Sequence, residues 1–174
     1  MTVAEINPVL TRHIVAGGPP LDLAGYRAVG GYESLRVAVE TMSPGEVREL
    51  VKESNLRGRG GAGFPTGLKW GFMPQGPGSP SPKYIIANGD GMEPGTFKDR
   101  LLIHGHPHQL VEAMIIAAWA LQADVGYIFL RPEYEAGTHL LESAIAEAHA
   151  AGLLGDNVLG SRWSFELYAH TSAG

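Results

Sequence analysis

Val125-Gly126-Tyr127-Ile128-Phe129-Leu130 is a short run of apolar and aromatic residues in the second half of the chain. Six residues are too few for an ordinary buried helix, whereas such a composition is typical of a strand buried inside a sheet. Lys83–Ala87 has the same character, and Trp163–Ala169 alternates apolar and polar residues. We therefore predict a β-sheet built from these three segments.

The segments between the predicted strands have a helical pattern. From His108 to Leu121 the apolar residues recur on one helical face. A second helix is expected to begin at Pro132 and to end near Ala150. The order strand, helix, strand, helix, strand implies right-handed crossovers and parallel strands. The predicted fold class is α/β, a Rossmann-like parallel sheet with helices on both faces.

Residues 1–22 precede this domain, and we predict that they form an extended arm because prolines and glycines interrupt them. An arm that crosses a neighbouring surface and a frayed terminus both fit that composition. Short helices are expected over residues 23–29 and 32–42, and Ser43-Pro44-Gly45-Glu46 predicts a capped helix start. Residues 23–174 are assigned to one α/β domain.

Composition excludes several classes of protein. The chain has 174 residues, a net charge of −5 and no cysteine. The acidic balance argues against a nucleic-acid partner, and without thiolates the chain offers no cysteine ligands for an iron–sulfur cluster or for zinc. Met1–Glu5 lacks the basic segment of a secretory signal. The longest apolar run, Ala113–Leu121, is far shorter than the roughly 20 residues that cross a bilayer, so we expect no direct membrane insertion.

The strongest functional signal is a glycine-rich stretch, Gly58-Arg59-Gly60-Gly61-Ala62-Gly63-Phe64-Pro65-Thr66-Gly67-Leu68-Lys69-Trp70. Successive glycines let backbone N–H groups turn toward one anion, and two cations bracket the run. The stretch contains G-x-G-x-x-G, but it follows a predicted helix rather than a strand, and it lacks the order of a P-loop. It predicts backbone amides for a phosphate, Lys69 for charge and Phe64 for stacking on a flat ring. A flexible linker is the alternative, although a linker would carry Ser and acidic residues instead.

A second polar loop follows the strand predicted at Lys83–Ala87. It runs through Asn88-Gly89-Asp90-Gly91 and Met92–Arg100, with three carboxylates and two cations. Ligands of open α/β sheets bind beyond the carboxyl ends of strands. Carboxylates beside a phosphate site favour recognition of ribose or nicotinamide, and a solvated turn is the alternative.

Three histidines, His104, His106 and His108, lie at alternate positions after this loop. No acidic residue lies within three positions of them in sequence, and a metal site needs a closed set of ligands. We therefore predict no metal site, and we expect His106 to His108 to cap the helix that follows.

Together, the two loops resemble the NADH-binding flavoprotein subunit of respiratory complex I. The resemblance is carried by Gly58–Trp70 and by Met92-Glu93-Pro94-Gly95-Thr96-Phe97-Lys98-Asp99-Arg100-Leu101. It extends to Tyr127–Arg131 with Glu133-Tyr134, and to Ala151–Gly155. It covers nearly the whole chain from about Leu23 onward. The diaphorase subunits of NAD-reducing hydrogenases and of NAD-dependent formate dehydrogenases are similar too.

The resemblance implies FMN as cofactor and NAD(H) as substrate, with hydride transfer from NADH to FMN and electrons passing on to iron–sulfur clusters. It implies no catalytic side chain, because the flavin carries the chemistry. The implied FMN-binding residues are Gly58, Arg59, Gly60, Gly61, Ala62, Gly63, Lys69, Asn88 and Asp90. The implied NADH-binding residues are Phe64, Pro65, Thr66, Gly67 and Glu93.

The chain departs from the family pattern in two places. The family has Asn-Ala-Asp-Glu where this chain has Asn88-Gly89-Asp90-Gly91, so a carboxylate near the flavin is missing. The family also continues past the position of Gly174 into a Tyr-Ile-Cys-Gly-Glu-Glu segment, and a 4Fe-4S cluster is expected only in the full-length family. We therefore expect residues 23–174 to be an FMN- and NADH-binding domain that is incomplete at its C-terminal end.

The function implied is that of an NADH dehydrogenase (quinone) flavoprotein subunit or a fragment of one. The implied partners are a thioredoxin-like 2Fe-2S subunit and a large iron–sulfur subunit, and the implied location is cytoplasmic, peripheral to the inner face of the cell membrane through those partners. Three alternatives stay open: a diaphorase subunit of a hydrogenase or formate dehydrogenase, the flavin-less relative in membrane-bound ferredoxin:NAD oxidoreductases, and a truncated non-catalytic module that binds a nucleotide or a partner.

Overall fold

The computed structural model describes residues 8–171, so the start of the predicted arm and the last three residues of the chain lie outside it. Arm residues 8–22 form turns without a helix or strand. They lie against helix α5 (Lys98–Gly105), where Ile14 packs so closely that a Cβ on Gly105 would be 2.6 Å from its Cδ1. One glycine therefore lets this part of the arm rest on the domain.

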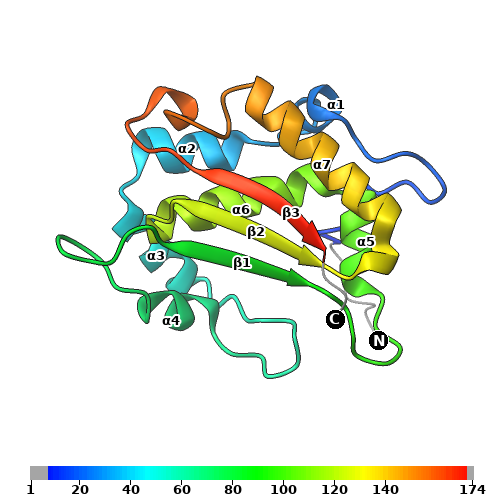
Figure 1. Cartoon of the computed structure of the whole chain (residues 1–174), viewed down its shortest axis with the longest axis horizontal. Coiled ribbons are helices and arrows are strands. Elements are labelled where there is room, and N and C mark those ends of the chain that lie inside the picture. The colour runs from blue at the N-terminus through cyan, green and yellow to red at the C-terminus, as the bar shows by residue number, and fades with distance from the viewer. Residues whose placement is uncertain (1–7, 172–174) are drawn as a thin grey trace, which may run out of the picture.

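Three parallel strands form a sheet in the order β1–β2–β3 (Figure 1). They are β1 (Tyr84–Gly89), β2 (Val125–Leu130) and β3 (Glu166–Thr171). The register places Tyr127 between Ile86 and Tyr168. The predicted Rossmann-like α/β arrangement is confirmed. The third strand begins later than predicted because Phe165 instead forms an antiparallel bridge with Gly155.

In Figure 1, α2 and α7 lie beyond β3, α3 and α4 lie beyond β1, and α6 lies behind β2. The α-helices of the described residues are α1 (Leu23–Ala28), α2 (Glu33–Thr41), α3 (Pro44–Glu53), α4 (Thr66–Gly71), α5, α6 (Pro107–Leu121) and α7 (Glu135–Ala150). Two 3-10 turns, η1 (Pro132–Tyr134) and η2 (Val158–Gly160), complete the set. The helices predicted from sequence are confirmed to within a few residues, but α4 and α5 fall in segments predicted as loops. No helix within residues 8–171 is long and apolar enough to cross a membrane.

Local sequence determines where helix α3 begins, and the helix leads into the glycine-rich stretch. Ser43 caps the helix by accepting from the Glu46 N–H, and the Glu46 carboxylate accepts from the Ser43 N–H at 2.7 Å. This is the predicted capping box, with Pro44 at the first helical position. After the helix, Asn55 takes a φ of +53°, which ends the helical run.

The two faces of the sheet are covered unequally. Strands in sequential order joined by crossovers of one hand place their connecting helices on the same face. Helices α6 and α7 accordingly pack on the face of Ile85, Ile128 and Leu167, which are buried. On the opposite face Ile86 and Tyr168 are 68% and 48% exposed in the structure of residues 8–171. Parallel sheets usually bury both faces, so this apolar face is an unusual surface.

A buried carboxylate ties the N-terminal helices to α6. The Tyr26 hydroxyl of α1 donates to one Glu112 oxygen, and the Leu35 N–H of α2 donates to the other at 3.2 Å. Glu112 is buried, so these two hydrogen bonds satisfy a group that would otherwise be costly to remove from water. Burial and the bond to Glu112 raise the pKa of Tyr26 well above its usual range, which keeps the phenol protonated as the donor.

A second buried polar cluster surrounds His108. The Tyr32 hydroxyl lies 2.9 Å from His108 Nδ1, and Glu147 of α7 lies 3.3 Å from Nε2. His106 occupies the N-cap position of α6, but neither histidine caps the helix, since no side-chain capping bond is formed there. The predicted capping role is therefore wrong: burial beside the Tyr26 ring of α1 gives both histidines a packing role instead.

Candidate functional site

The glycine-rich stretch begins as a closed loop and continues as α4. The Gly58 N–H donates to the Phe64 carbonyl at 2.9 Å, which closes the neck of the loop. Gly61 and Gly63 have φ values of +117° and +62°, which residues with a Cβ rarely adopt. A Cβ built on Gly60, Gly61 or Gly63 would meet nothing within 4 Å. The backbone at the tip of the loop is therefore open to a ligand.

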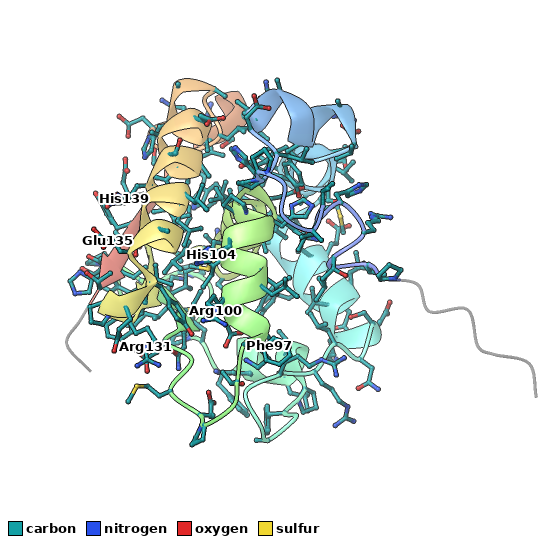
Figure 2. All side chains as sticks on the ribbon, turned by 90° about the vertical axis from the view of Figure 1, so that its right-hand side faces the viewer. Phe97, Arg100, His104, Arg131, Glu135 and His139 are labelled. Carbon is teal, nitrogen blue, oxygen red and sulfur yellow. The ribbon has the colours of Figure 1, made fainter. Side chains whose placement is uncertain are left out.

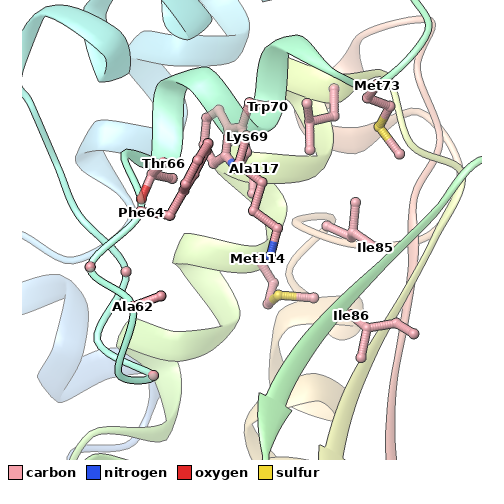
Figure 3. Close-up of a pocket in the computed structure, with 14 residues that line it drawn as sticks. Ala62, Phe64, Thr66, Lys69, Trp70, Met73, Ile85, Ile86, Met114 and Ala117 are labelled. Atoms are coloured by element: carbon pink, nitrogen blue, oxygen red, sulfur yellow. The ribbon is translucent and has the colours of Figure 1, made fainter.

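A cavity of about 500 Å³ lies between this loop, α4, α6 and β1 (Figure 3). The predicted site residues that line it are Gly58, Gly60, Ala62, Gly63, Phe64, Thr66 and Lys69. The rest of its wall is apolar and consists of Trp70, Met73, Ile85, Ile86, Met114, Ala117 and Leu121. Its volume lies in the range of roughly 300–1,000 Å³ that is usual for cofactor pockets.

Lys69 is the charged residue in this wall. Figure 3 shows its side chain reaching from α4 toward Met114 of α6. Among the described residues no carboxylate lies within ion-pair distance of it. Open glycine amides, one lysine and an apolar wall suit a ligand that joins an anionic group to a flat ring. FMN has this chemistry, so the residues present fit it.

Four predicted residues of the same stretch do not line the cavity: Arg59, Gly61, Pro65 and Gly67. Gly67 is buried against α3, where a Cβ would collide with the Cα and Cβ of Lys52. Its missing side chain thus has a packing reason, because it lets α3 and α4 approach closely. The ligand-binding roles of these four residues stay predictions.

Asn88, Asp90 and Glu93 lie at and beyond the C-terminal end of β1, outside the lining of the first cavity. The Asn88 Oδ1 accepts from the Asp90 N–H at 3.0 Å, which shapes the turn. Asp90 Oδ1 is buried without a partner in the structure of residues 8–171. Glu93 lines a second cavity, of about 490 Å³, between the loop 91–96, α5 and η1. The predicted site residues therefore do not all line one cavity: most of those in the glycine-rich stretch line the first, Glu93 lines the second, and Asn88 and Asp90 line neither.

Gly91 stands where the family pattern has glutamate, and its surroundings favour glycine. Its φ is +66°, and a Cβ there would lie 2.7 Å from the Tyr134 hydroxyl. A side chain at this position would require Tyr134 to move.

Sequence reasoning missed Phe72 and the contribution of α6. Phe72 is 75% exposed, and its ring lies 6.1 Å from that of Phe64 at the cavity. The two rings come together because residues 66–71 are helical, which was not predicted. Met114 and Leu121 were predicted on the buried stripe of α6, but helical spacing does not distinguish a core position from a cavity wall.

In the described residues no group of three or more His, Asp or Glu is arranged to hold a metal ion. The fold is that of a Rossmann-like α/β domain with a cavity between a glycine loop and the edge of its sheet.

Comparison with known proteins identifies the family. The family model described as Nuo51 FMN-binding domain matches residues 51–173. The chain belongs to this family, and the resemblance seen in its two loops is confirmed.

Several bacterial NADH-quinone oxidoreductase subunits share about half of their matched residues with this chain. The one from Salmonella typhimurium is 54% identical over 171 residues, covering 98% of this chain and 38% of that protein. Its counterpart of the same name in Escherichia coli is 53% identical over 170 residues, with the same coverage of 98% and 38%. A similarly named protein of Rhizobium meliloti is 49% identical over 168 residues, covering 97% of this chain and 39% of that protein. The chain therefore spans about two fifths of the length of these curated relatives.

Among solved structures, an NAD+-reducing NiFe-hydrogenase in the air-oxidized state superposes with a TM-score of 0.65 and 30% sequence identity. The match covers 90% of this chain and 25% of that chain. This match supports the assignment of the fold, because a second type of enzyme contains a similar structure.

Proposed function

We propose that this chain binds FMN in the cavity beside the glycine loop and NADH next to it, as the nucleotide-binding part of an NADH:quinone oxidoreductase flavoprotein subunit. The observation that carries the proposal is the cavity itself, in which open glycine amides and Lys69 face an apolar wall. FMN bound there would supply the capacity to accept a hydride from NADH and to release electrons singly. The chain's own residues bind, orient and shield the reactants.

The polar part of the cavity is assigned to the phosphate. The backbone around Gly60 and Gly63 is unobstructed, and amides in such a loop hold anions. Lys69 adds a positive charge at the same wall. The apolar residues of α4 and α6, with Trp70 and Met114 among them, exclude water from the flat ring.

The exposed pair Phe64 and Phe72 is assigned to a base of NADH. Aromatic rings bind flat heterocycles by offset stacking, and both rings are accessible beside the cavity. Glu93 is assigned to NADH as the family pattern implies, and Asn88 and Asp90 to the flavin. The orphaned Asp90 Oδ1 supports a polar ligand near that turn.

The names of the relatives support an assembly with other subunits. We propose a thioredoxin-like 2Fe-2S subunit and a large iron–sulfur subunit as partners, and a cytoplasmic location peripheral to the membrane. A diaphorase subunit of an NAD-reducing hydrogenase is the second candidate, which the structural match to such an enzyme favours.

The proposal is tested by titrating FMN with the chain and following the loss of flavin fluorescence. We expect saturable quenching by the wild-type chain and an affinity at least about tenfold lower for Lys69→Gln, because a hydrogen bond to a charged group contributes about 1.5–3 kcal/mol. Lys52→Gln is the matched control, since Lys52 pairs with Glu49 on the exposed surface of α3.

Absence of quenching, or equal affinity of the wild-type and Lys69→Gln chains, would contradict the flavin assignment. With FMN bound, NADH:ferricyanide reductase activity then separates an active domain from a non-catalytic nucleotide-binding module.

A further inference from the structure

The second cavity is polar, whereas the first is mostly apolar. It lies at the C-terminal ends of β1 and β2, between the loop 91–96, α5 and the start of α7. Figure 2 shows Arg100 and His104 on α5 with Arg131 near them at the start of the η1–α7 segment. All three line the cavity of about 490 Å³. Ligands of open α/β sheets commonly bind at this end of the strands.

Arg131 is held in a fixed orientation with one nitrogen to spare. Its Nε and Nη2 each donate to Glu133 at 2.9 Å, and its guanidinium lies 5.8 Å from the centre of the Tyr134 ring. The hydrogen bond from Arg131 lowers the pKa of Glu133 to about 2, so both members of the pair are charged at neutral pH. In the structure of residues 8–171, Nη1 of Arg131 has no hydrogen-bond partner. This nitrogen remains able to donate to a ligand.

Arg100 brings a second guanidinium to the same wall. No carboxylate of the described chain lies within ion-pair distance of it. Two guanidinium groups that converge on one cavity match the geometry of phosphate oxygens better than lysines do. Thr96 lines the same cavity, and a threonine hydroxyl can serve as a neutral donor.

His104 forms the buried end of this wall. Its Nε2 is buried without a partner in the described residues. It packs against α7 at Gly137, where a Cβ would lie 3.0 Å from that nitrogen. Gly137 therefore lets α7 close tightly against α5, and the cavity ends in a polar ring rather than in apolar core.

The cavity also carries carboxylates, which argue against a simple inorganic anion. Glu93 and Glu133 both line it. Carboxylates recognise the hydroxyls of a sugar, as in the binding of ribose by dinucleotide-binding folds. The cavity thus combines cations that suit a phosphate with carboxylates that suit hydroxyls. This combination fits a ligand that carries both a phosphate and hydroxyl groups.

We propose that the second cavity is a binding site for a sugar phosphate, with Arg100 and Arg131 holding the phosphate and Glu93 accepting from the sugar hydroxyls. The site shares Glu93 with the proposed NADH site and rests on the proposed function for that residue. It goes beyond that function through the two arginines, neither of which lines the glycine-loop cavity. The ligand is a free sugar phosphate or the same group within a nucleotide.

The test is calorimetric titration of the full chain with ribose 5-phosphate, AMP, inorganic phosphate and ribose. Ribose 5-phosphate is expected to bind at least about tenfold more tightly than inorganic phosphate or ribose, because only it engages both sets of side chains. Arg100→Gln and Arg131→Gln are each expected to weaken that binding at least about tenfold. Arg131→Lys keeps the positive charge but loses the planar guanidinium with its paired donors. It is therefore expected to retain only part of the affinity for ribose 5-phosphate.

Arg36→Gln is the matched control, because Arg36 also pairs with carboxylates but lies on the exposed surface of α2. Melting temperatures of all variants show that they fold. AMP binding that depends on the two arginines supports the site and identifies a nucleotide as the source of the phosphate, and equal affinity for AMP and ribose 5-phosphate supports a free sugar phosphate. No binding, or binding that survives both Arg100→Gln and Arg131→Gln, overturns the proposal.

Lys69→Gln separates this site from the flavin cavity. Loss of ribose 5-phosphate binding in that variant would place the ligand beside the glycine loop and would also overturn the proposal. The flavin titration of the same variant reports on the first cavity alone.

Discussion

Gly67 illustrates how a single residue can belong to a functional motif for a structural reason. It lies inside the glycine-rich stretch, yet it faces α3 rather than the cavity. The pattern of glycines predicts where a ligand approaches the backbone. Gly60 and Gly63 do line the cavity with an unobstructed backbone, and ligand binding there stays a prediction. The pattern does not reveal which glycine serves helix packing, because that depends on α4, which the sequence pattern did not indicate.

We predict that Gly67→Ala lowers the free energy of unfolding by an amount at the upper end of about 1–3 kcal/mol, because the new methyl group meets the backbone of Lys52. Gly71→Ala, at the other end of α4, is the control. A Cβ on Gly71 meets nothing within 4 Å, so alanine should be neutral or stabilise by up to about 1 kcal/mol through its helix propensity. Urea denaturation measures both, and equal effects of the two substitutions would contradict the packing role.

The two buried histidines at the start of α6, His106 and His108, are expected to make stability depend on pH. Burial lowers the pKa of His106 and of His108 below its ordinary value, and the nearby Glu147 only partly offsets this for His108. The unfolded chain, with a histidine pKa of about 6.5, therefore binds protons that the folded chain does not. Stability is then complete above about pH 6.5 and falls as the pH decreases below it.

We expect the free energy of unfolding to decrease between pH 7.5 and pH 5.5, with a smaller decrease in His108→Gln. His139→Gln is the control, because the His139 side chain is 70% exposed on α7. Urea denaturation at several pH values provides the measurement. An identical pH dependence in the wild-type and His108→Gln chains would refute the contribution of His108.

At the scale of elements, the sequence predicted long periodic helices and buried strands well, and short helices poorly. The capping box at Ser43 and the apolar stripe of α6 are strong local signals. Helix α4 has six residues and α5 has eight, and neither has a side-chain cap. Their formation depends on packing against α3, α6 and α7, and no local pattern records such contacts.

Strand β1 places adjacent isoleucines in opposite environments, which provides a direct test of the sheet. Ile85 is buried under α6, whereas Ile86 is on the open face. Ile85→Ala should lower the free energy of unfolding by about 2–5 kcal/mol because it leaves a cavity in the core. Ile86→Ala should change it by less than about 0.5 kcal/mol. Chemical denaturation of both variants measures this contrast, and a reversed order would mean that the two faces have been assigned incorrectly.

At the scale of the whole molecule, the order of elements was enough to predict a parallel α/β sheet, because crossover handedness leaves few alternatives. The same reasoning could not show that one face is open. Tyr127 and Phe129 continue the apolar and aromatic run of β2, so the sequence of this strand is typical of one buried on both sides. The candidate site, likewise, was predicted only in part. Motifs identify the two loops, but only the fold shows that the loops line two cavities instead of one.

The position of Trp70 has a practical consequence. It lines the glycine-loop cavity, whereas the other two tryptophans, Trp119 and Trp163, do not and instead pack edge to face with ring centres 5.4 Å apart. Indole emission depends on its immediate surroundings, so a molecule that enters the cavity changes the signal of Trp70 most directly. The chain thus carries a built-in optical reporter of cavity occupancy, and it needs no attached dye.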